Sequence, residues 1–342
     1  MKRLISLLCA TWLLALAVIS GSAARVAAPP VNDLLQFLPD ASGVALVDVQ
    51  KCIASPVWAV ISSQDKIRRE LEHLEGDASE LGIRLEDLQA LAITFNKMDF
   101  GSPTVAVSGG FDQNTILAKL RANPKYKVTS EKYKDVEITS VENVTPPASQ
   151  PTDASKSSDV KINKQVVRFL FYDSSTAVIG SLDSLHGSVD AKLGTRPNIG
   201  QNAQLATALG ENAGAPIRFA MSVTPDISGK LQSSELPLPD LSSIRLIWAS
   251  IDLSSGVNLI ATLRNDSAEH AKAIVDRLNN LLMMVRGFLG ASNDPKMSGL
   301  VETINSVTVT GADTDVKITG NVTLDALKTF LGGASAAPAR KP

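Results

Sequence analysis

The sequence predicts an α+β fold of two layers, in which mostly antiparallel sheets carry helices on one face and repeated β-hairpin–helix units occur in two copies. The first observation is that pairs of β-rich apolar runs, joined by turn residues, recur along the chain, which is the signal of a hairpin. The second is that an amphipathic helix pattern follows each pair. The 342 residues, 44% of them hydrophobic and 20% charged, exclude wholesale disorder and suffice for about two domains.

The hairpin–helix unit is expected four times. Ser181, Asp266 and Asn321 stand where three of the helices need a cap, because a side-chain oxygen can accept an orphan backbone N–H there. For each unit, the first strand, the second strand and the helix are expected in that order at the following residues: 91–96, 104–108 and 112–122; 166–172, 176–180 and 181–193; 245–252, 257–263 and a long helix from 266; and 306–310, 316–319 and 322–331.

Two of the expected helices carry wide apolar stripes at spacings of three and four residues. Such a stripe usually faces a sheet in the same molecule, and the alternatives are a partner helix or lipid. The long helix has Ala271, Ile274, Val275, Leu278, Leu281, Leu282, Val285, Phe288 and Leu289; an earlier helix has Val57, Val60, Ile61, Ile67, Leu71 and Leu74.

The two halves of the chain resemble each other, which predicts an internal duplication. LLQFLPDASGVALVDV, from Leu34, is matched by LATALGENAGAPIRFAMSV, from Leu205. The first copy has an extra helix and an extra hairpin, 126–130 with 136–140. The expected domains are a first α+β repeat at 31–195, with an exposed loop at 144–160, a second at 196–331, and a loose tail at 332–342.

The N-terminal residues 1–24 have the pattern of a secretory signal peptide. Lys2 and Arg3 precede an apolar run, and the small residues that follow it allow cleavage after Ala23 or Ala24. We therefore expect a periplasmic or extracellular protein; the alternative is an inner-membrane anchor, with membrane contact only if the signal is retained. Cys52 would be the only cysteine of the mature chain, which excludes an internal disulfide, and we interpret it as a small buried hydrophobe.

Four stretches carry a resemblance to known proteins. They are FLPDASGVALVDV, YKDVEITSV before RFLFYDSSTAVIGSLDSLHGSVDAKLG, NAQLATALGENAGAPIRFAMSV, and the repeated hairpin–helix units. In them the chain resembles a family of exported bacterial proteins of unknown function. The resemblance implies a two-copy α+β scaffold outside the cytoplasm, and it implies no reaction and no catalytic residue.

The residues that enzymes use most often form no recognisable set. His73, His186 and His270 are far apart and lie in no metal-binding motif, and no G-x-S-x-G is present. Ser63 and Ser158 begin S-x-x-K matches without the companion elements of that active site. We predict no catalytic, cofactor-binding or metal-binding residue and no cofactor. Loss of the signal leaves 31 basic against 35 acidic residues, and this acidity argues against a nucleic-acid partner.

Two basic–aromatic triplets are the candidate surface site. Lys125, Tyr126 and Lys127, with Lys132, Tyr133 and Lys134, are expected on neighbouring strands. There they could stack on and neutralise an anionic polymer, a glycan or a lipid headgroup. The alternative is an edge hairpin whose lysines discourage pairing with another chain.

The leading functional hypothesis is a non-enzymatic exported protein with a binding or structural role, whose partner is an envelope protein, a glycan or a lipid. The first alternative is a carrier or chaperone for an apolar ligand or lipid. It requires an apolar cavity between the sheet and the long helix, lined by Leu281, Leu282, Met283 and Phe288. The second alternative is a hydrolase whose dispersed acidic residues converge in one cleft.

Overall fold

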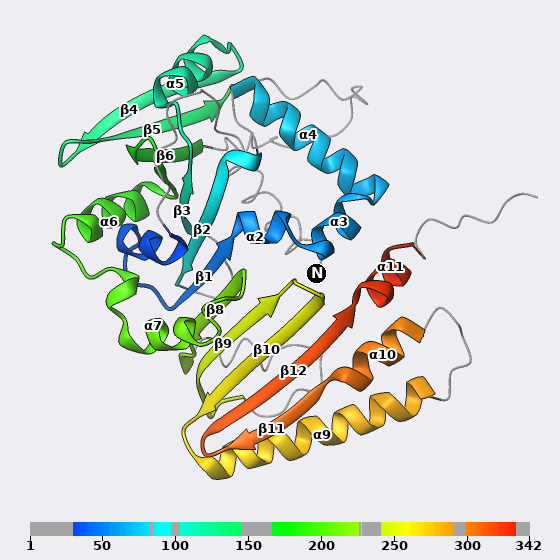
Figure 1. Cartoon of the computed structure of the whole chain (residues 1–342). Coiled ribbons are helices and arrows are strands. Elements are labelled where there is room, and N and C mark those ends of the chain that lie inside the picture. Colours follow the sequence, from blue (N-terminus) through cyan, green and yellow to red (C-terminus); the bar gives the residue numbers. More distant parts are fainter. Residues whose placement is uncertain are drawn as a thin grey trace, which may run out of the picture.

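The computed structural model describes residues 30–81, 85–96, 103–144, 166–225, 227, 241–290 and 298–332. They contain one open sheet of twelve strands, with every neighbouring pair antiparallel, so the predicted α+β class and antiparallel pairing are confirmed (Figure 1). In order across the sheet the strands are β11 (Thr308–Ala312), β12 (Asp315–Thr323), β10 (Gly256–Asn265), β9 (Ile244–Asp252), β8 (Ile217–Ser222), β1 (Gly43–Asp48), β2 (Leu88–Phe95), β3 (Thr104–Gly109), β7 (Thr176–Ile179), β6 (Val166–Asp173), β5 (Val136–Asn143) and β4 (Tyr126–Tyr133).

The two halves of the chain share this sheet, because β1 pairs with β8 at its centre. Outward from that pair, the first half runs β1-β2-β3-β7-β6 and the second runs β8-β9-β10-β12-β11. Apart from the β4–β5 hairpin, the strands of the two halves follow the same order. The predicted extra hairpin is β4 and β5, which extend the sheet beyond β6 and make β4 one of its two edges.

The helices of the described residues occur in both halves, with the longest in the second half and the next longest in the first. They are η1 (Val31–Phe37), α2 (Val49–Ile53), α3 (Pro56–Ser62), α4 (Asp65–Leu81), η2 (Leu85–Asp87), α5 (Gln113–Ala122), α6 (Leu182–Lys192), η3 (Ile199–Gln201), α7 (Ala203–Gly210), α9 (Ala268–Gly290), α10 (Ser298–Ser306) and α11 (Leu324–Gly332). The sequence did not predict α10, which contacts α9, α11 and β12.

Both faces of the central strands are covered. In β1, Leu46 packs in a first core cluster with η1, α6 and α7, whereas Val47 packs in a second cluster with α2 and α5. The prediction of two layers with helices on one face is therefore wrong. The physical reason is clear in β3, whose six residues are all buried, because a strand buried on both sides needs a covering layer on each.

A third core cluster lies between α9 and the sheet. Ala271 and Ile274 of the helix pack with Val309 of β11 and Val316 of β12. It is on the same face as the second cluster, since side chains alternate along a strand and β8 places Ile217 in one and Met221 in the other. The opposite face of β12 carries the polar residues Asp315, Lys317, Thr319 and Asn321.

Of the three predicted helix caps, one is at the predicted residue. Ser181 accepts a hydrogen bond from the backbone of Ser184 at the start of α6. At the other two, the cap is one or two residues later than predicted. Ser267 accepts from His270 N before α9, and Thr323 accepts from Ala326 N before α11.

Some predicted segments lie outside the described residues. These are the signal peptide at 1–24, nearly all of the loop at 144–160, and the tail beyond Gly332. Within the part of the chain that the structure describes, none of the helices has the length and apolar character needed to cross a bilayer.

Candidate functional site

The two basic–aromatic triplets lie at opposite ends of β4, not on neighbouring strands as predicted. Residues 126 and 133 are roughly 23 Å apart at the usual rise of a strand. Because the offset from 126 to 133 is odd, the two side chains point to opposite faces: Tyr126 packs beside the second core cluster and Tyr133 beside the first. The six residues therefore do not share one surface.

The second triplet is held against α6. The Tyr133 ring stacks on His186 with centroids 4.0 Å apart, and its hydroxyl donates to Asp190 at 3.2 Å. Lys134 Nζ is 2.7 Å from the same carboxylate, and this hydrogen bond holds the pKa of Asp190 below its usual range. Tyr133 and Lys134 thus fix the hairpin tip to the helix.

Lys125, Lys127 and Lys132 are exposed along the edge strand β4. Lysines on an edge disfavour pairing with a strand of another chain. The geometry favours this role over stacking on a polymer, since the tyrosine rings at the two ends face away from each other. Binding of an anionic ligand by these lysines remains a prediction.

The three histidines lie in different parts of the fold. His186 Nε2 is 3.3 Å from Glu131 on β4, His270 Nδ1 is 2.6 Å from Asp266 at the start of α9, and His73 is exposed on α4. Among the described residues, no group of three His, Cys, Asp or Glu side chains is placed to hold a metal ion.

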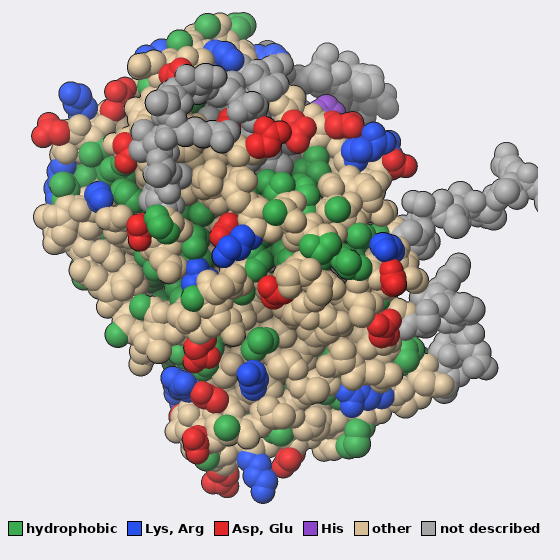
Figure 2. Space-filling view, in the orientation of Figure 1, with side chains coloured by type: hydrophobic (Ala, Val, Ile, Leu, Met, Phe, Trp, Pro, Cys, Tyr) green, Lys and Arg blue, Asp and Glu red, His purple; other side chains and the backbone are tan. Residues whose placement is uncertain are grey.

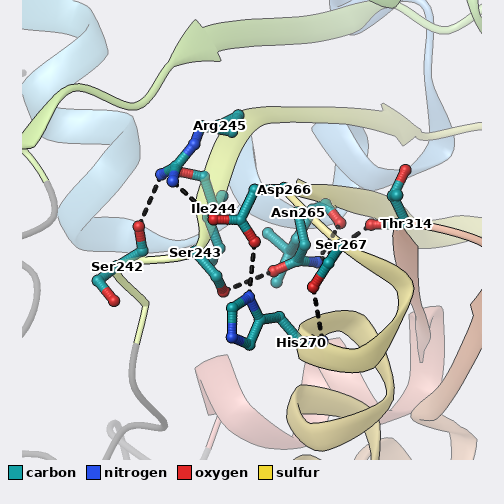
Figure 3. A network of polar contacts seen from close by, with 10 residues as sticks. Ser242, Ser243, Ile244, Arg245, Asn265, Asp266, Ser267, His270 and Thr314 are labelled. Carbon is teal, nitrogen blue, oxygen red and sulfur yellow. Dashed lines mark hydrogen bonds and ion pairs between the residues drawn. The ribbon is translucent and has the colours of Figure 1, made fainter.

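Asp266 joins a polar network where β9, β10 and the start of α9 meet (Figure 3). Its carboxylate accepts from His270 and pairs with Arg245 Nη2 at 2.7 Å; the hydrogen bond to His270 is the main reason that the pKa of Asp266 is lowered. Ser243 Oγ donates to Asn265 Oδ1 at 3.0 Å rather than to the histidine. The network fixes the first turn of the helix.

Cys52 lies in α2 and is half-buried. Burial, with a smaller contribution from the nearby carboxylate of Asp48, raises the pKa of its thiol to about 11. A thiol with a raised pKa is a poor nucleophile, so this side chain agrees with a packing role.

The outer face of α9 is apolar near its C-terminal end. Met283 is 62% exposed, Met284 69% and Phe288 77%. Leu282 packs beside the third core cluster and Leu289 is buried. The predicted stripe was too wide: a helix resting on a sheet buries one side, so the remaining apolar residues face solvent.

The same exposures count against the predicted carrier cavity. Leu282 faces the sheet, whereas Met283 and Phe288 face away from it. Together with Leu281, which is half-buried, they do not surround a common space. An apolar ligand held between α9 and the sheet would contact Leu282 but not Met283 or Phe288.

A hollow of about 260 Å³ lies beside α7, where the sequence predicted no site. The residues that line it are far apart in the sequence and are brought together by the fold. They are Ala203, Gln204, Thr207, Ala208 and Glu211 from the α7 region, Leu246 and Trp248 from β9, and Arg264 from β10. Glu211 is the one acid in this lining, so the hollow does not provide the pair of carboxylates that the hydrolase alternative requires.

Comparisons with known proteins give distant structural matches and no activity. No family model matches the chain, and no curated protein matches it. Solved structures that resemble it include crystal forms of TP0453, a Treponema pallidum protein. Form III has a TM-score of 0.46 and 9% identity, covering 91% of this chain and 100% of that chain; form IV has 0.44 and 9%, covering 91% and 98%. At these TM-scores and identities, the similarity to TP0453 transfers no residue's role.

Proposed function

We propose that the protein is an exported, non-enzymatic binding protein that docks another envelope protein on the outer face of α9. The observation that carries this proposal is the exposure of Met283, Met284 and Phe288 on a helix whose other side is firmly packed. Leaving large apolar side chains in water forgoes about 1.5–3 kcal/mol each. Clustered exposed apolar residues commonly mark interaction sites.

The charges around the helix favour a protein partner over a lipid surface. On α9, Glu269 and Asp276 balance Lys272 and Arg277, all of them exposed. Figure 2 shows acidic and basic side chains interspersed over this end of the molecule. Helices that lie on membranes usually carry a strongly basic polar face instead. Methionine is also well suited to protein interfaces because its flexible side chain adapts to a partner.

Export, absence of enzymatic activity and descent from a duplication belong to the same proposal. Export is supported by the signal pattern at 1–24, and the duplication by the shared strand order and the matching segments from Leu34 and Leu205. The non-enzymatic role is supported by the missing sequence motifs and by the structural contacts of His186 and His270. The intact mass of the mature protein from its own host tests export, because cleavage after Ala23 or Ala24 gives defined values.

Site-specific photocrosslinking tests the docking face. A photoreactive amino acid at position 284 or 288, in the mature protein within its own cell envelope, is expected to give a discrete protein adduct of the same mass. The control is position 317, an exposed lysine on the polar face of β12. Met283→Glu should abolish the adduct at 288. Lipid adducts, equal labelling at position 317, or no adduct at either position would contradict the proposal.

A further inference from the structure

The hollow beside α7 has an apolar floor and a polar rim. Ala208, Leu246 and Trp248 are each no more than 5% exposed and form the floor. Glu211 and Arg264 supply opposite charges at the rim. An apolar surface with a few convergent polar groups is the usual composition of a small-molecule site. The volume of about 260 Å³ is just below the usual range of about 300–1,000 Å³, so it fits only a small ligand.

The Glu211 carboxylate is held in place by Trp248, one of the floor residues. The buried indole N–H of Trp248 donates to Glu211 Oε2 at 2.8 Å. An ionised carboxylate offers roughly four acceptor positions, so this bond leaves room for further donors. A ligand ammonium group would meet an acceptor whose orientation is already fixed.

The Arg264 guanidinium is fixed from two directions. Its Nε and Nη2 each donate to Asp315 at 2.8 Å, and its central carbon lies 5.0 Å from the Trp248 ring centre. A guanidinium has five N–H donors, so the bidentate pair leaves others for a second carboxylate. Rigid groups of this kind bind a ligand with little loss of conformational entropy.

We infer that this hollow binds a small zwitterion, a free α-amino acid with an apolar side chain. The ligand's ammonium group faces Glu211, its carboxylate faces Arg264, and its side chain covers Leu246 and Trp248. This site is separate from the outer face of α9 and does not depend on the docking proposed there.

Trp248 provides the measurement. Of the three tryptophans in the chain, Trp12 lies in the signal, so Trp58→Phe in the mature protein leaves Trp248 as the only indole. L-alanine, L-leucine and L-phenylalanine are titrated while its fluorescence is followed, and calorimetry on the unmodified mature protein checks the result. At least one amino acid is expected to give a saturable change by both methods. Two matched probes for leucine are 4-methylpentanoate, which lacks the amine, and 3-methylbutylamine, which lacks the carboxylate.

Each leucine analogue should bind at least about tenfold more weakly than leucine, because each lacks one charged hydrogen-bonding group. Glu211→Gln should weaken amino-acid binding by a similar factor. Glu302→Gln removes the same charge from the exposed surface of α10 and should leave binding unchanged. The inference is overturned if none of the three amino acids binds, if either analogue binds as well as leucine, or if Glu302→Gln weakens binding as much as Glu211→Gln.

Discussion

At the scale of single residues, Gly43 shows how closely the centre of the sheet is packed. A Cβ atom at this position would lie 2.3 Å from Cε2 of Phe95 and 3.2 Å from Cβ of Met221, both of them buried. We expect Gly43→Ala to lower the free energy of unfolding by about 1–3 kcal/mol, as overpacking does. Denaturant unfolding measures it. Gly287→Ala is the control, since a Cβ there meets nothing within 4 Å and alanine favours a helix. Equal stability of Gly43→Ala and wild type would contradict this packing.

Two serines with no exposed surface differ in their hydrogen bonds. Ser188 Oγ donates to the Phe37 carbonyl and is 3.0 Å from the Tyr172 hydroxyl, whereas Ser108 Oγ has no partner among the described residues. Ser188→Ala should lower the free energy of unfolding by about 1–3 kcal/mol, because it leaves a buried acceptor unsatisfied. Ser108→Ala should leave it equal or higher. Denaturation curves of the two variants test these expectations. A loss of stability in Ser108→Ala would show that the Ser108 hydroxyl has a hydrogen-bond partner.

At the scale of elements, the two sides of α9 should respond differently to substitution. Ile274 is 3% exposed in the third core cluster, so Ile274→Ala should lower the free energy of unfolding by about 2–5 kcal/mol. Met284→Ser and Phe288→Ser should change it by about 0.5 kcal/mol or less, because both side chains already lie in solvent. Thermal unfolding of the three variants tests this contrast. A marked loss of stability in the serine variants would mean that the outer face packs within the molecule.

The contact between the β4–β5 tip and α6 should depend on pH. The hydrogen bond from Lys134 lowers the pKa of Asp190 in the folded protein. A lowered pKa stabilises the fold above the unfolded value of about 3.9, and this contribution is lost as pH falls through the folded pKa. Asp190→Asn should therefore lose stability at neutral pH and show a shallower decline below about pH 4. Urea midpoints measured across that pH range provide the check, and Lys134→Gln is expected to behave like Asp190→Asn. If the midpoints of the wild type and the variants fall in parallel as pH is lowered, the Lys134–Asp190 contact does not contribute to the pH dependence of stability.

The elements that sequence predicted well are those set by local chemistry. The turn at 173–175 is an example: Asp173, the last residue of β6, accepts from Ser175 N through Oδ1 and so fixes the turn that leads into β7. The side of the sheet that each helix covers depends on distant strands, and the prediction was wrong there. The hollow beside α7 was missed for the same reason. Glu211, Trp248 and Arg264 come from separate parts of the chain and meet only because α7 packs against β8, which lies beside β9 and near β10 in the sheet.

At the scale of the whole molecule, the continuous sheet predicts that the two halves unfold together. The first core cluster contains Leu46 from one half and Trp248 from the other, across the β1–β8 pair. Opening that pair would expose apolar surface of both halves at once, which favours a single cooperative transition. Trp248 lies in the second half, and Trp58 lies on α3, which belongs to the first half and also contacts β10 and α11 of the second. In Trp58→Phe and in Trp248→Phe, the urea midpoint from the remaining tryptophan should coincide with the midpoint from far-UV circular dichroism of the same variant. Two separated midpoints would show that the repeats at 31–195 and 196–331 are independent domains that merely share a strand pairing.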